Sequence, residues 1–181
     1  MKSIFARNFA IYALVIVLGF VILGSAFISQ VNRFALQEKQ QQLADALERA
    51  VQFTASYFTL RESNEWNGQL GANYRMTMHM LASDCSGTIF VADRGGSLLF
   101  IADADGCYSQ EDNGLSMPEP ALDALMRDGY YTQTSNFYGY LSAQNYVMGS
   151  AVTADGETIG AVFVCMPAQA TEELLDRKSV V

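Results

Sequence analysis

Residues 87–103, GTIFVADRGGSLLFIAD, form the clearest hairpin signal in the sequence. Two runs rich in β-branched and aromatic residues flank Arg94, Gly95 and Gly96. Runs of this kind, separated by a short glycine-containing turn, are typical of antiparallel strands. The stretch therefore predicts a β-hairpin near the middle of the chain.

A second hairpin is predicted near the end, at residues 145–167, which read NYVMGSAVTADGETIGAVFVCMP. The turn ADGE at residues 154–157 contains Asp-Gly, a favoured pair for a tight hairpin turn. Between the hairpins, residues 118–129 predict a helix that Ser116 caps and Gly129 ends. Residues 130–140, YYTQTSNFYGY, predict either a strand or an aromatic loop.

The N-terminal part of the chain predicts a membrane anchor. Residues 9–28, FAIYALVIVLGFVILGSAFI, contain no charge, and twenty helical residues span about 30 Å, the hydrocarbon thickness of a bilayer. A cleaved signal peptide is the alternative, but its apolar region is usually shorter, about 7–15 residues. Lys2 and Arg7 favour a cytoplasmic N-terminus, residues 1–8, and place the remainder outside the cytoplasm.

A long helix is predicted to follow at residues 29–64, because neither Gly nor Pro occurs between Ser29 and Glu62. An apolar stripe runs along it at alternating spacings of four and three. Two interpretations are open: the stripe packs against its own domain, or it pairs with the same helix of a second subunit in a parallel homodimer. The members of the stripe are Leu43, Leu47, Ala50, Thr54 and Tyr57.

Charge and motifs exclude several functions. The portion from about residue 30 carries nine basic and nineteen acidic side chains, and this excess of negative charge argues against nucleic-acid binding. Glycine-rich phosphate loops, zinc-protease motifs and nucleophile-elbow motifs do not occur in the sequence. The lone histidine, His79, supports no catalytic arrangement. We predict no catalytic residues, no metal and no cofactor in this chain.

The three cysteines permit one disulfide. Folding the chain about Gly95 and Gly96 places residue 85 opposite about residue 106, within reach of a cross-strand bond. We therefore expect a disulfide between Cys85 and Cys107, with Cys165 free; the alternative is that all three thiols are free.

The two hairpins and the preceding long helix together resemble the extracytoplasmic sensing domains of bacterial membrane receptors, of the PAS-like or single-Cache type. The resemblance covers about residues 30–175. It implies an α+β fold, with a transmembrane helix, a long helix and a PAS-like antiparallel sheet, at residues 65–167, flanked by helices. The parent protein would then be a two-component sensor histidine kinase, embedded in the cell membrane. The alternatives are a chemoreceptor, a cyclase or a stand-alone anchored binding or assembly protein.

In this family the ligand lies against the sheet, under the segments that link the strand pairs. The resemblance therefore implies a small-molecule site in the tyrosine-rich region between the hairpins. Tyrosine offers apolar area together with a hydroxyl group, which suits such a site. The expected lining residues are Arg75, Tyr108, Tyr130, Tyr131, Tyr138 and Tyr146; ordinary core and surface aromatics are the alternative.

The family domain usually lies between two membrane helices. We expect residues 168–175 to begin an outgoing helix that leads to a second one, so that this chain is the front part of a longer receptor. Residues 176–181, DRKSVV, are expected not to be native, because GAT CGG AAG AGC GTC GTG, one back-translation, matches the start of a sequencing-library adapter. The alternative is an ordinary gene that ends with a charged tail.

Overall fold

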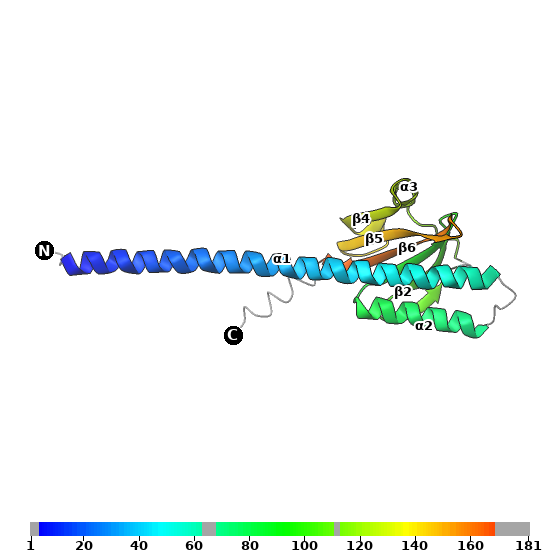
Figure 1. The fold of residues 1–181 in the computed structure, drawn as a ribbon, viewed down its shortest axis with the longest axis horizontal. Coiled ribbons are helices and arrows are strands. Elements are labelled where there is room, and N and C mark those ends of the chain that lie inside the picture. The colour runs from blue at the N-terminus through cyan, green and yellow to red at the C-terminus, as the bar shows by residue number, and fades with distance from the viewer. Residues whose placement is uncertain (1–3, 63–67, 111–112, 169–181) are drawn as a thin grey trace. The chain divides into compact units, whose positions relative to one another are not determined.

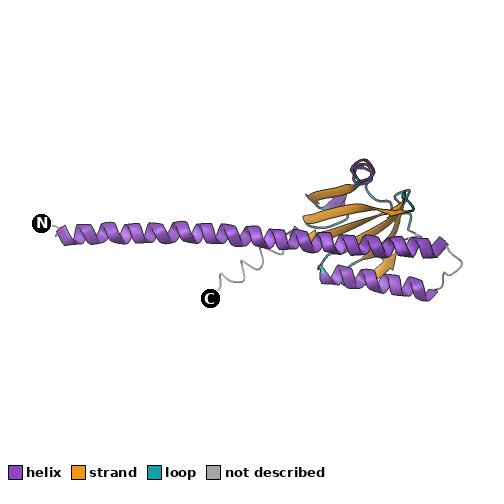
Figure 2. Cartoon of the chain, in the orientation of Figure 1, coloured by secondary structure: helices purple, strands orange, loops and turns teal. Residues whose placement is uncertain are grey.

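The computed structural model of the chain describes residues 4–62, 68–110 and 113–168. Helix α1 (Ile4–Glu62) comes first, and α2 (Gly68–Asp84) follows. The remaining elements are β1 (Thr88–Asp93), β2 (Leu98–Ala102), β3 (Cys107–Ser109), α3 (Glu119–Asp128), β4 (Tyr130–Ser135), the 3-10 turn η1 (Phe137–Gly139), β5 (Asn145–Ala154) and β6 (Glu157–Pro167). This order is α+β, as predicted (Figure 2).

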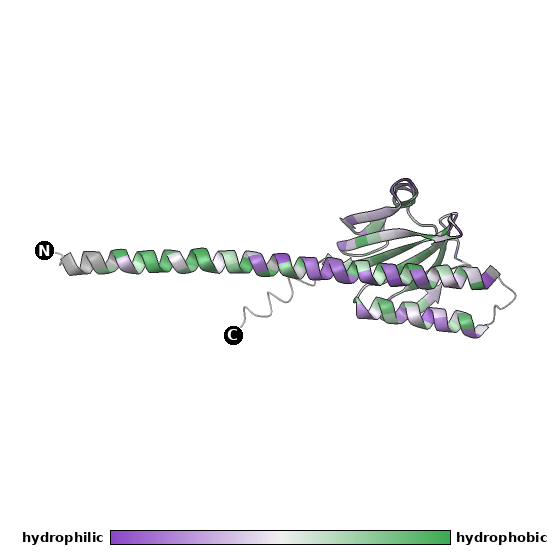
Figure 3. Ribbon diagram, in the orientation of Figure 1, coloured by the Kyte–Doolittle hydropathy of each residue, from purple (hydrophilic) through white to green (hydrophobic). Residues whose placement is uncertain are grey.

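The chain divides into two units, residues 1–39 and 40–181. In the first unit, α1 is predominantly hydrophobic (Figure 3). Its large apolar side chains are exposed, and among the described residues α1 is the one helix long and apolar enough to cross a membrane. A signal sequence near the N-terminus has the same composition, so this feature gives weak support for a membrane location.

The second unit is built on a six-stranded antiparallel sheet with strand order β3-β2-β1-β6-β5-β4. Both predicted hairpins are confirmed. Asp93 fixes the β1–β2 turn, because its carboxylate accepts hydrogen bonds from the backbone N–H of Gly95 and Ser97 at 2.9 and 2.8 Å. At the β5–β6 turn, Asp155 and Gly156 both have positive φ, +52° and +82°, as a tight Asp-Gly hairpin turn requires.

Helices cover both faces of the sheet (Figure 1). On one face, the part of α1 from Gln40 onward and α2 pack over β1, β2 and β6. Tyr57 of α1 stacks on Tyr74 of α2 with 4.1 Å between ring centroids, and both rings meet Phe100 of β2 edge-on. On the opposite face, α3 and η1 cover a second core. A sheet with helices on both faces buries the apolar side chains of either side.

The apolar stripe of α1 lies inside the domain. Leu43 and Ala50 are 1% and 0% exposed, and Leu47, Thr54 and Tyr57 are also buried. The first of the two interpretations therefore applies to these residues, and the stripe is not available to a partner helix. The expected parallel homodimer would need a different surface of α1.

The expected β1–β2 register is confirmed, since Ile89 pairs with Ala102, but both strands end before they reach Cys85 and Cys107. The chain turns back after β2, and this turn places Cys107 on β3 opposite Ala102. Cys85 instead follows the last turn of α2, where its thiol contacts the carbonyl of Ala82. Cys85, Cys107 and Cys165 are all free thiols in the structure, so the alternative with three free thiols describes it.

Candidate functional site

The sheet face opposite α1 and α2, here called the aromatic face, holds a compact group of ring side chains. Phe90 comes from β1, Tyr131 from β4 and Phe163 from β6, and Phe137 enters from η1. All four are buried. Gly149 of β5 leaves room for this packing, because a Cβ there would stand 2.4 Å from the Phe163 ring. Rings from three strands therefore line this face, and the Phe137 ring packs among them.

Phe137 lies at the centre of this group. Its ring centroid is 5.3 Å from that of Phe163, 5.4 Å from Phe90, 6.1 Å from Tyr140 and 6.3 Å from Tyr131. These separations lie in the range of favourable tilted and edge-on ring pairs. Although η1 is a short turn outside the sheet, its first side chain is fully buried.

The backbone that places this ring is strained. Phe137 and Tyr138 have φ of +47° and +55°, and Gly139 has +91°. Glycine adopts this left-handed region at little cost, whereas each bulky residue held there costs about 1–3 kcal/mol. Burial of the Phe137 ring offsets this strain, so a strained backbone and a buried ring occur together in this segment.

Few polar contacts hold the segment. The backbone N–H of Phe137 donates to the hydroxyl of Ser135 at 3.1 Å. The hydroxyl of Tyr140 donates to the carbonyl of Ser116, in the segment that precedes α3. Since the last β4–β5 pair is Ser135 with Asn145, residues 136–144 lie outside the strand ladder. Movement of this segment therefore breaks the bond from the backbone N–H of Ala168 to the carbonyl of Gln144, 3.0 Å long, but none of the β4–β5 pairs.

Of the six predicted lining residues, two lie at this site. Tyr131 is buried on the aromatic face, and its hydroxyl donates to the side-chain carbonyl of Gln133. Burial raises the pKa of Tyr131, and the neighbouring hydroxyl of Tyr138 raises it further. Tyr138 is half-exposed at the rim, with its ring centroid 6.2 Å from that of Phe137.

The other four predicted residues lie elsewhere. Tyr146 of β5 packs on the side of the sheet that α1 covers, and it pairs with Thr134 of β4. Tyr130 lies four positions before Thr134 on β4, so its side chain points to the same side, where it is 64% exposed. Arg75 is exposed on α2; burial raises the pKa of Cys107, and the charge of Arg75 opposes part of that rise. Tyr108 is 47% exposed on the edge strand β3. The structure therefore does not bring the six residues into one pocket.

The residues that the sequence reasoning missed are Phe90, Phe137 and Phe163. A signal for Phe137 was present in the run NFYGY, because Gly139 marks a backbone position of unusual conformation beside clustered rings. The sequence does not show which face of the sheet Phe90 and Phe163 occupy. In a sheet covered on both faces, every strand has apolar residues on both sides.

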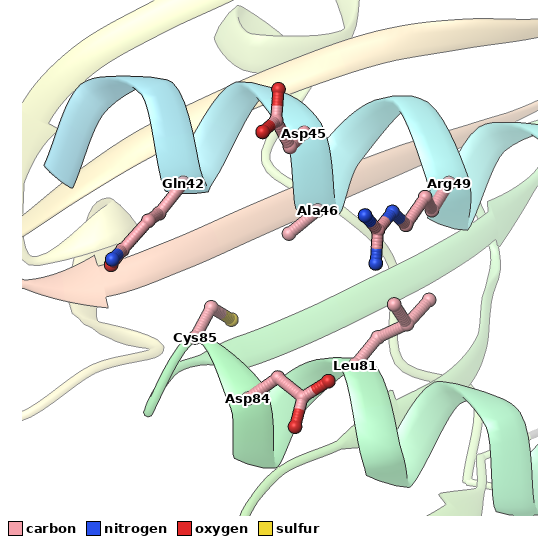
Figure 4. Close-up of a pocket in the computed structure, with 7 residues that line it drawn as sticks. All are labelled: Gln42, Asp45, Ala46, Arg49, Leu81, Asp84 and Cys85. Carbon is pink, nitrogen blue, oxygen red and sulfur yellow. The ribbon is translucent and has the colours of Figure 1, made fainter. Parts of the chain in front are cut away.

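The face covered by α1 and α2 carries cavities. A groove of about 200 Å³ between α1 and α2 is lined by Asp45, Arg49, Asp84 and Cys85 among others, with the Arg49 side chain reaching toward α2 (Figure 4). Its charged side chains are exposed and of both signs, so solvent and their mutual attraction already satisfy them. A second cavity, of about 310 Å³, lies between Leu43 of α1 and strands β4 and β5.

His79 has a structural contact. Its Nδ1 lies 2.9 Å from the backbone carbonyl oxygen of Asp103, which requires Nδ1 to carry the proton. The ring thereby ties α2 to the β2–β3 turn. This contact accounts for the lone histidine without a catalytic role.

Neither a protein-family model nor a curated protein matches this chain. Solved structures do. One match is the extracellular domain of vpHK1S-Z8, a protein described as a histidine kinase. It is 11% identical, with a TM-score of 0.59, and the match covers 81% of this chain and 57% of that domain. The sensory domain of the Campylobacter jejuni chemoreceptor Tlp3 with isoleucine bound matches at 12% identity and a TM-score of 0.48, over 80% and 65%. The E. coli DcuS sensor domain matches at 12% identity and a TM-score of 0.45, over 75% and 98%.

The likeness to the vpHK1S-Z8 domain defines the class of fold. The chain has the PAS/Cache-like α+β fold of extracytoplasmic sensor domains, as the resemblance in the sequence implied. It spans slightly less than two thirds of the Tlp3 domain and a smaller share of the vpHK1S-Z8 domain.

Proposed function

We propose that this chain is the signal-sensing region of a membrane receptor and binds a small molecule outside the cytoplasm. In this proposal, residues 1–8 are cytoplasmic, residues 9–28 cross the membrane and residues 65–167 form the sensor. The parent receptor is a sensor histidine kinase. The likeness to the extracellular domain of vpHK1S-Z8 supports the sensor assignment through its fold.

One observation carries the proposal: α1 is a single helix that contains both the apolar stretch and the residues at the centre of the sensor core. Leu43 and Ala50 on this helix pack against the sheet. A change in packing on the sheet is therefore transmitted directly to the helix that enters the membrane. Such a shift between two packing arrangements is a common means of signalling.

The ligand surface in this proposal is the aromatic face. It is lined by rings, lies under the segment that links β4 to β5 and becomes accessible when residues 136–144 move. Small-molecule sites are typically apolar and aromatic with a few polar groups at the rim, and Tyr131, Gln133 and Tyr138 supply those groups here.

A receptor chimera tests this function. Residues 1–168 are placed ahead of the second membrane helix and kinase of a receptor whose reporter output is measurable. Gly160→Ala should change the basal output, because a Cβ at residue 160 stands 2.6 Å from the Phe58 ring of α1 and forces a new helix position. Gly68→Ala, where a Cβ meets nothing within 4 Å, is the matched control. Equal output from both variants, at equal protein amounts, contradicts the proposal.

A further inference from the structure

We propose that Phe137 is a built-in occupant of the ligand site, and that the signal molecule is a compact, uncharged aromatic compound that takes its place. This inference rests on the proposed function and specifies the class of ligand. It starts from a side chain that is fully buried although its backbone lies outside the sheet.

The surroundings of Phe137 are those of a bound aromatic molecule. Four rings, from Phe90, Tyr131, Tyr140 and Phe163, surround it with centroids 5.3 to 6.3 Å away. They come from β1, β4, β6 and the segment after η1, so the ring is enclosed from several sides. A planar aromatic ligand would make the same contacts.

The charge of the site determines the charge of the ligand. Among the described residues, the buried polar side chains are Thr54, on α1, and Asn145, which lies on the same side of β5 as Val147 of the aromatic face and whose amide donates to the carbonyl of Ala143 at 2.8 Å. A charged group placed on this face would lose its hydration with no charged partner to compensate. The ligand is therefore uncharged, and a hydroxyl or ring N–H on it could reach Tyr131 or Gln133 at the rim.

The segment is prepared for release. Two bulky residues, Phe137 and Tyr138, are held at positive φ, and this strain is relieved when the segment lifts. The hydroxyl of Tyr140, which donates to the carbonyl of Ser116, ties the segment to the α3 side. Opening breaks this tie and the bond that the carbonyl of Gln144 accepts from the backbone N–H of Ala168 at 3.0 Å, but none of the β4–β5 pairs.

A binding experiment on the full chain in detergent tests the inference. Indole is the probe, and indole-3-carboxylate is the charged probe of the same ring. Apparent affinity depends on the fraction of open molecules. Tyr140→Phe keeps the ring and removes the tie, so indole should bind about two- to tenfold more tightly than to the wild type. Phe137→Ala removes the occupant and should tighten binding further. Tyr130→Phe, the same change at an exposed residue on the other face, should leave binding unchanged.

Three results would overturn the inference. The first is an equal affinity of the wild type and Tyr140→Phe for indole, and the second is that indole-3-carboxylate binds as tightly as indole. The third is that only Phe137→Ala binds indole, which would indicate a cavity made by the substitution. Tyr140→Phe keeps the test decisive where Phe137→Ala does not fold. The receptor chimera reports on the sensor assignment without indole. If Gly160→Ala changes the output of the chimera but indole binding gives any of these three results, the occupant role of Phe137 is rejected and the sensor assignment is retained.

Discussion

The hydroxyl oxygens of Thr54 on α1 and Tyr74 on α2 lie 2.9 Å apart in the buried interface between the two helices. Thr54 is fully buried and Tyr74 is 6% exposed, so each hydroxyl depends on the other as its partner. The same burial raises the pKa of Tyr74, and the hydrogen bond from Thr54 opposes part of that rise. This pair fixes the alignment of α1 with α2.

Thr54→Val should lower the free energy of unfolding by about 1–3 kcal/mol, because it leaves the Tyr74 hydroxyl buried without a partner. Tyr74→Phe should cost a similar amount for the same reason. The double variant should cost less than the sum of the two single variants. Chemical denaturation of all four proteins, followed by circular dichroism, measures the coupling; strictly additive losses would show that the two hydroxyls do not interact.

Gly160→Ala should destabilise the domain by about 1–3 kcal/mol, since overpacking a filled core forces side chains or backbone to move. A Cβ at residue 160 would stand 2.6 Å from the Phe58 ring and 2.7 Å from the backbone oxygen of Ala92. Gly68→Ala, at the first residue of α2, is the control and should be neutral or slightly stabilising. Equal melting temperatures for both variants are incompatible with this packing.

Stability should fall as the pH rises from about 9 to 11. Burial raises the pKa of Cys107 to about 11 from its ordinary value of 9.0. Above pH 9 the unfolded chain releases this proton while the folded chain retains it, so unfolding becomes more favourable. Cys107→Ala should flatten this part of the curve. Denaturant midpoints across the range give the measurement, and a curve that is the same in both proteins refutes the role of Cys107.

Leu47→Ala should cost about 2–5 kcal/mol of unfolding free energy and leave the oligomeric state unchanged, because Leu47 packs inside its own domain. Glu48→Ala, next to it on the exposed side of α1, is the control. Denaturation combined with light scattering in detergent separates the two effects. A variant of normal stability that dissociates a dimer would show that the stripe pairs two chains after all.

The sequence predicted those elements whose signal is local. Asp93 with Gly95 and Asp155 with Gly156 specify their turns through their own backbone preferences, and both hairpins formed as expected. The stripe on α1 was also visible, but one sequence does not distinguish packing within a chain from packing between chains. The burial of Leu43 and Ala50 resolved this for the stripe.

Other features depend on tertiary contacts. Ser116 was expected to cap α3, yet the helix begins at Glu119 after Pro118, and its N-cap makes no side-chain hydrogen bond. The carbonyl of Ser116 instead accepts the hydroxyl of Tyr140, 24 residues away. Likewise, the reversal of the chain after β2 moved Cys107 away from Cys85. The ring cluster around Phe137 joins four separate segments, which no local pattern announces. The predictions for residues 169–181 lie outside the described residues.

The central claim, a sensor held outside the cytoplasm by α1, is tested most directly by labelling one cysteine in intact bacterial spheroplasts. The native cysteines are replaced by alanine, and Ala72→Cys places a thiol on an exposed residue of α2. A membrane-impermeant maleimide should label this thiol in intact spheroplasts, whereas Ser3→Cys at the N-terminus should react only after the membrane is disrupted. Labelling of Ala72→Cys only after disruption would contradict the account.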